Sequence, residues 1–185
     1  DEFQYYHNYV RACTAETNSN GFLEYTHLSA SIYKMVELVL QKPHDVDARN
    51  SISGDIIFHS VALSQLLKID LYIENGKSGT FCQKNPENYA IDLSKRAKST
   101  STAFLHLERN KTDEYCKQNM AYELNELIET TNDNSETVSL HHLLEINIQR
   151  RRGADKLLVD RAAHILQNPY MQLELESNTI YPLLY

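Results

Sequence analysis

Tryptophan is absent from this chain of 185 residues, and glycine, proline and cysteine are scarce, with five, four and three copies. So little glycine and proline excludes a collagen-like or linker-like chain. Three widely spaced cysteines do not make a disulfide framework, so we expect a reducing, cytoplasmic location. Apolar runs of the ~18 residues that a membrane-spanning helix needs are also missing. We therefore expect a folded chain without a membrane span.

The charge balance is acidic. Asp and Glu outnumber Lys and Arg by 25 to 18, which gives a net charge of −7 with histidine neutral. A general nucleic-acid binder usually carries a positive face, so we expect no nucleic-acid partner. Hydrophobic residues make up 42% of the chain, which is ordinary for a folded protein.

Apolar residues recur with helical periodicity along most of the chain, which predicts an all-α fold. Polar stretches between them are expected to be loops, at residues 15–21, 42–55, 77–88 and 130–137. The expected helices are 3–14, 27–41, 57–74, two short helices within 89–109, then 115–129, 138–149 and 153–167.

A short pattern recurs within the first half of the chain. Residues 25–30, 57–62 and 90–94 set His27, His59 and Asp92 among apolar and small residues, at a spacing of roughly 33 residues. The DVDARN stretch at 45–50 follows the first copy. These residues resemble the ankyrin repeat, whose unit of about 33 residues is a β-turn followed by two antiparallel helices. The resemblance implies a solenoid of stacked helix–turn–helix units.

The resemblance also implies a division of the chain into four segments. We expect a capping helix over 1–20, divergent ankyrin repeats over 21–109, a helical insertion over 110–135, and further degenerate repeats over 136–185, cut at the C-terminus. Small residues at Ala30, Ala62 and Ser94 are expected to let neighbouring helices approach closely.

Ankyrin arrays bind other proteins, so the resemblance implies a protein–protein interaction module, an adaptor or scaffold with no catalytic activity and no cofactor. Contacts in such arrays come from the turn tips and the inner helices. The partner-binding residues carried over in this way are Asp45, Asp47, Arg49 and Asn50 in one turn, and Lys77, Ser78, Thr80 and Gln83 in the next.

Two other settings fit the same residues. The chain is also compatible with the cytosolic ankyrin portion of a larger ion-channel protein, or with a viral or pathogen ankyrin effector that binds a host protein. An enzyme is the remaining class, and His59 would be its test residue. Histidines at fixed repeat positions favour a structural role, so we predict neither a catalytic nor a metal site. The basic cluster Arg150–Arg152 is expected to be a solvated helix end.

Overall fold

The structure is a computed structural model that describes residues 2–71, 85–132 and 140–154. Over these residues the chain is helical throughout, without strands, which confirms the all-α prediction for this part of the chain. The helices are α1 (Glu2–Glu16), α2 (Gly21–Gln41), α3 (Val46–Leu66), α4 (Pro86–Arg109), α5 (Glu114–Asn132) and α6 (Leu140–Ala154).

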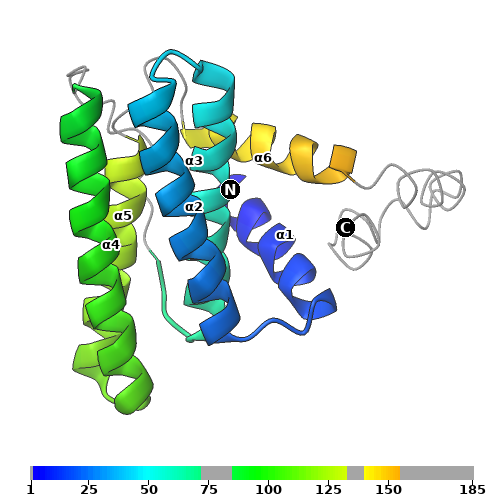
Figure 1. Cartoon of the computed structure of the whole chain (residues 1–185). Coiled ribbons are helices and arrows are strands. Elements are labelled where there is room, and N and C mark those ends of the chain that lie inside the picture. Colours follow the sequence, from blue (N-terminus) through cyan, green and yellow to red (C-terminus); the bar gives the residue numbers. More distant parts are fainter. Residues whose placement is uncertain (1, 72–84, 133–139, 155–185) are drawn as a thin grey trace, which may run out of the picture.

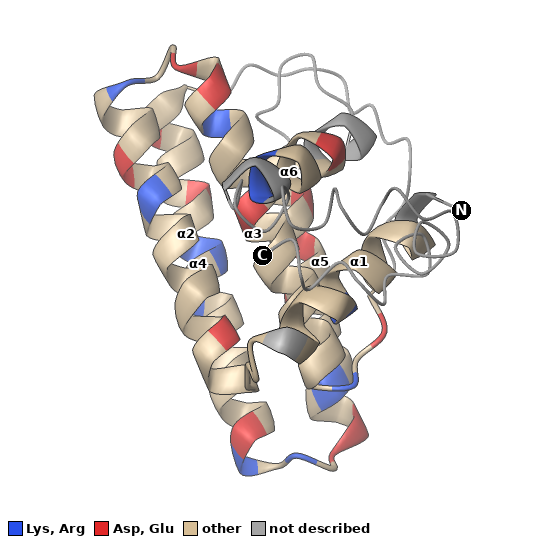
Figure 2. Cartoon of the chain, turned by 90° about the vertical axis from the view of Figure 1, so that its right-hand side faces the viewer, with Lys and Arg blue, Asp and Glu red and all other residues tan. Residues whose placement is uncertain are grey.

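Helices α2 to α5 form a four-helix bundle (Figure 1). α2 and α3 make one antiparallel pair and α4 and α5 another, and the two pairs meet where α2 packs on α4 and α3 packs on α5. Figure 2 shows α2 and α4 together along one side of this bundle. α1 and α6 pack against α3, so α3 is the central helix of the described structure.

An Asn or Asp side chain caps the N-terminus of four of these helices. The side-chain oxygens of Asn20, Asp45 and Asn85 accept hydrogen bonds from the backbone N–H groups two or three residues later, at 2.8–3.1 Å. Asp113 does the same for the backbone N–H of Tyr115 at 2.8 Å. Each bond satisfies one of the orphan donors of a helix N-terminus, so these residues set where α2 to α5 start.

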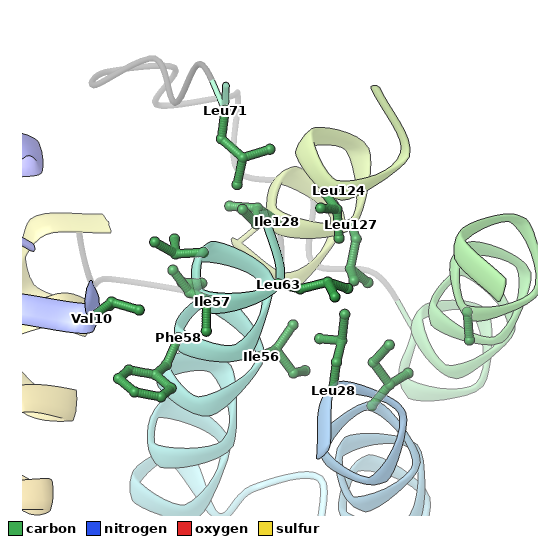
Figure 3. Close-up of a cluster of buried hydrophobic side chains, with 14 of the residues drawn as sticks. Val10, Leu28, Ile56, Ile57, Phe58, Leu63, Leu71, Leu124, Leu127 and Ile128 are labelled. Atoms are coloured by element: carbon green, nitrogen blue, oxygen red, sulfur yellow. The ribbon is translucent and has the colours of Figure 1, made fainter. Parts of the chain in front are cut away.

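The hydrophobic core lies between α3 and its neighbours. Figure 3 shows Ile56 and Leu63 of α3 near Leu28 of α2, with Leu124 and Leu127 of α5 beside them. α3 buries residues on every side of its axis. Many of its buried residues are small, and small residues let several helices approach one helix at once: Ser53, Gly54, Ser60, Ala62 and Ser64.

Several predicted boundaries were wrong. Residues 46–55 belong to α3 rather than to a turn, and 86–109 form one continuous helix rather than two short ones. Sequence reasoning looked for one apolar stripe, and α3 has none because it is enclosed on all sides. The 115–129 helix, expected as an insertion, is α5, which is part of the bundle and contributes Leu124 to its core.

The predicted repeat register is also wrong. His27, His59 and Asp92 lie inside long helices, whereas the ankyrin pattern places them at turn–helix junctions. Ala30 and Ser94 are exposed, and of the three predicted close-approach positions only Ala62 is buried. Ankyrin membership itself stays a prediction. The expected helix at 153–167 lies outside the described residues, apart from residues 153 and 154 in α6, and so does the expected repeat segment beyond residue 154.

Candidate functional site

The predicted contact residues at 45–50 do not form a turn tip. Asp45 is the N-cap of α3 and accepts a hydrogen bond from the backbone N–H of Ala48 at 3.1 Å. Asp47, Arg49 and Asn50 lie in the first turns of that helix, and Asn50 is buried. Only Asp45 and Asp47 are exposed among these four residues. The second predicted set, Lys77, Ser78, Thr80 and Gln83, lies outside the described residues.

The two repeated histidines are close to a buried carboxylate. Oε2 of Glu24 in α2 lies 2.8 Å from Nδ1 of His59 in α3, and both side chains are largely buried. Ser19 donates a hydrogen bond to the other carboxylate oxygen, Oε1, at 2.8 Å. The His27 ring meets the His59 ring edge-on, with 5.3 Å between centroids. The cluster thus joins the loop before α2 to both helices of the first pair.

Burial raises the pKa of the Glu24 carboxyl, but its partners outweigh this effect. The hydrogen bond and charge of His59, the hydrogen bond from Ser19 and the charge of His27 together bring the pKa below the ordinary value for glutamate. Glu24 is therefore ionised at neutral pH. A carboxylate hydrogen-bonded to Nδ1 fixes the orientation of an imidazole. Such a histidine can serve as a general base or as a structural contact between two helices.

Groups of three or more His, Cys, Asp or Glu side chains that could hold a metal ion are absent from the part of the chain that the structure describes. The His59 ring packs edge-on against Phe58 as well as His27. The Glu24–His59 contact therefore acts in this structure as a tie between α2 and α3.

The basic cluster lies in the last turns of α6, where Arg150 is exposed as predicted, whereas Arg151 is half-buried, which corrects the prediction of a solvated side chain there. Both guanidinium groups donate hydrogen bonds to Oδ1 of Asp55 in α3, the Arg151 bond at 3.2 Å. Arg151 also lies over the Phe58 ring, 3.4 Å from its centroid, as a cation–π contact. Burial lowers the pKa of Arg151, and the Asp55 carboxylate opposes that shift.

Asn147 lies one turn before Arg151 and is fully buried against α3 and α1. Its Oδ1 accepts a hydrogen bond from the Tyr6 hydroxyl at 3.2 Å, and its Nδ2 donates to Asp55 at 3.3 Å. Burial raises the pKa of Tyr6, which keeps its hydroxyl protonated as the donor. Gly54 makes room for Asn147, because a Cβ at position 54 would lie 3.0 Å from the Cβ of Asn147.

Large apolar side chains lie exposed along the outer side of α2 and α4. On α2, Phe22 and Tyr33 are 68% and 61% exposed, and Leu40 is about half exposed. On α4, Ile91 and Leu105 are also about half exposed. We call these five residues the outer α2–α4 face. Exposed apolar residues are ordinary when they are scattered singly, so their positions relative to one another decide whether they matter.

The register of α2 against α4 brings exposed apolar residues of the two helices close in height. The Tyr25 ring of α2 stacks on Phe104 of α4 with 4.4 Å between centroids, and its hydroxyl hydrogen-bonds the Ser101 hydroxyl. The two helices run antiparallel (Figure 1), so Phe22, three residues before Tyr25, and Leu105, one residue after Phe104, lie toward the same end of the helix pair.

The remaining apolar residues of the face lie farther along the same two helices. At 1.5 Å per residue, Tyr33 and Leu40 lie about 16 and 27 Å beyond Phe22, and Ile91 lies about 21 Å beyond Leu105, so the height of Ile91 falls between those of Tyr33 and Leu40. The outer α2–α4 face therefore carries two apolar groups, Phe22 with Leu105 toward one end of the helix pair and Tyr33, Leu40 and Ile91 toward the other.

Comparisons of the chain with protein-family models, with curated protein sequences and with solved structures gave no match. Helices long and apolar enough to cross a membrane are absent from the described residues. Function therefore has to be inferred from the arrangement of the residues themselves.

Proposed function

We propose that the chain is a protein–protein interaction module that binds its partner through the outer α2–α4 face. The supporting observation is the exposure of five large apolar side chains, two of them aromatic, on two helices that pack against each other. Tyrosine and phenylalanine are enriched in the cores of protein interfaces, where they bury a large area at a small cost in side-chain entropy.

The ankyrin resemblance implies the same class of function by a different surface. Its turn tips would be the contact points, but Asn50 is buried and Arg49 is half-buried in α3. The outer α2–α4 face requires no repeat register, so the proposal holds whether or not the chain is a divergent ankyrin array. Placing the binding surface on rigid helices also favours a preformed interface over one that must be ordered on binding.

A catalytic role has one candidate feature, the Glu24–His59 pair. Its contacts favour a structural role, because the imidazole is largely buried and the rings of His27 and Phe58 pack edge-on against it. A substrate site would need an open space beside the base and a second reacting group within about 3 Å. We therefore propose binding without chemistry as the function of this chain.

Paired variants of the full chain test this proposal. Phe22→Ser with Tyr33→Ser removes the two most exposed side chains of the face, and Tyr122→Ser is the matched control, since Tyr122 is 57% exposed on α5. Each chain is incubated with extract of its source cells, the captured proteins are quantified by mass spectrometry, and affinity is then measured with the purified partner. Aromatic hot spots cost 2 kcal/mol or more, so we expect about a thirtyfold weaker affinity for the double variant. Equal affinity for the double variant and the control would reject the face as the binding surface.

A further inference from the structure

The described side chains of α6, from 144 to 151, attach it through apolar and polar groups together. Leu144 and Asn147 are buried, and Ile148 packs half-buried against the hydrophobic core. Arg150 and Arg151 add ion pairs to Asp55. α6 packs on α3 and α1 only, and Figure 1 shows it projecting to the side of the four-helix bundle. α6 is therefore held by one neighbouring surface and is not enclosed by the bundle.

The surface beneath α6 has the properties of a recognition site. It offers a carboxylate from Asp55, an aromatic ring from Phe58, a hydroxyl donor from Tyr6, and a flat spot at Gly54 where a side chain can approach the α3 backbone. One Asn side chain occupies the flat spot, and an Arg one turn later pairs with the carboxylate and the ring. These groups select for side-chain type as well as for helical spacing.

We propose that α6 is a reversibly docked helix, and that the α1–α3 surface beneath it is a helix-binding site that reads an Asn followed four residues later by an Arg. A partner helix with this pattern would replace α6 and make the same contacts to Asp55, Phe58 and Tyr6. This site lies on the α1 and α6 side of α3, whereas the outer α2–α4 face lies on other helices, so the two proposals stand independently.

Amide hydrogen exchange of the full-length chain tests whether α6 docks reversibly. A helix held by few buried contacts opens locally, so the amides of 144–151 should exchange faster than those of 56–63 in α3. Asp55→Asn removes the charge that both arginines share. Hydrogen bonds to charged groups contribute about 1.5–3 kcal/mol, so protection of α6 should fall roughly tenfold to a hundredfold while the bundle keeps its protection.

Arg96→Gln is the matched control for this variant. Arg96 of α4 pairs with Glu126 of α5 at 3.2 Å, so the substitution also breaks one inter-helix ion pair, but inside the bundle. It should leave exchange in α6 unchanged. The proposal is overturned if the wild-type amides of α6 and α3 exchange at the same rate, a comparison that needs no variant.

A labelled peptide of residues 140–154 tests the helix-binding site. It is added to the full chain carrying Asn147→Ala and Arg151→Ala, which loosen the resident helix, and binding is followed by fluorescence anisotropy. We expect saturable binding that is lost when Asp55→Asn is added to the chain or Arg151→Gln to the peptide. Absence of saturable binding, or equal binding by the Arg151→Gln peptide, would contradict the site.

Discussion

Replacing Gly54 by alanine separates two effects that act on different helices. Gly54 lies within α3, where glycine is less favourable than alanine by about 0.5–1 kcal/mol. The added Cβ would lie 3.0 Å from the Cβ of Asn147 and 3.1 Å from its Nδ2. The Cβ of Asn147 is fixed to its helix backbone, so relief requires α6 to move. Overpacking of this kind costs about 1–3 kcal/mol.

The gain in helix propensity and the cost of overpacking act on different parts of the chain. While α6 stays docked, the overlap exceeds the gain in helix propensity, so docking becomes less favourable. When α6 is released, the bundle keeps the propensity gain, so the loss cannot exceed the stabilisation that docking supplies. Because urea unfolds the chain from the docked state, we expect Gly54→Ala to lower the free energy of unfolding by up to about 2 kcal/mol, the overlap cost less the propensity gain. Protection of the α6 amides should at the same time fall about tenfold.

Urea denaturation followed by circular dichroism measures the bundle, and amide exchange of residues 144–151 measures α6. Gly21→Ala serves as control, because a Cβ there would meet only the Leu67 side chain at 3.4 Å, an ordinary contact distance. It should leave exchange in α6 unchanged. Wild-type protection of α6 in the Gly54→Ala chain would refute the reasoning, since it would mean that Asn147 does not lie against Gly54.

Three further predictions concern the bundle and its outer face. The partners of Glu24 lower its pKa, so the ionised carboxylate stabilises the fold fully above the ordinary glutamate pKa, and this stabilisation is lost as pH falls through the lowered pKa. Glu24→Gln should therefore reduce the free energy of unfolding by about 1–3 kcal/mol at pH 6. It should also make the free energy of unfolding less dependent on pH in the acid range. Burial and the charge of Arg11 lower the pKa of His7, and together they outweigh the charge of Asp70, which raises it. The folded chain therefore disfavours the charged form of His7. Stability should fall as pH drops below about 6.5, and His7→Gln should reduce that slope in thermal melts between pH 7 and 5; an unchanged slope would contradict the assignment. Tyr33→Ser alone should change the free energy of unfolding by less than about 0.5 kcal/mol in urea titrations, because Tyr33 is exposed.

The amphipathic helices were predictable because each buries one face. The apolar residues of 3–14 and 115–129 follow a single stripe, and the structure places helices there, as α1 and α5. α3 was only partly predicted, because its first turns carry the polar stretch DVDARN and its later turns are buried all round. An aspartate such as Asp45 is typical of a helix N-cap, but aspartate also favours turns. The sequence analysis therefore predicted a loop over 42–55 where α3 begins.

The contacts of the candidate sites could not be found from local patterns. Glu24 and His59 are 35 residues apart, and Asp55 and Arg151 are 96 residues apart. Only the packing of the helices decides that these charges meet. The repeated histidines did draw attention to His59, but for a repeat register that the helices do not follow. Nor does the sequence around Gly54 indicate that this glycine admits Asn147 of α6, 93 residues later.

The most direct test of the proposed function is site-specific photo-crosslinking in the source cells. A benzophenone side chain is placed at position 33 on the outer α2–α4 face, and at position 122 on α5 as the control. We predict a discrete crosslinked product of the chain with one other protein from position 33 and none from position 122. The same product from both positions, or from position 122 alone, would contradict binding through the outer α2–α4 face.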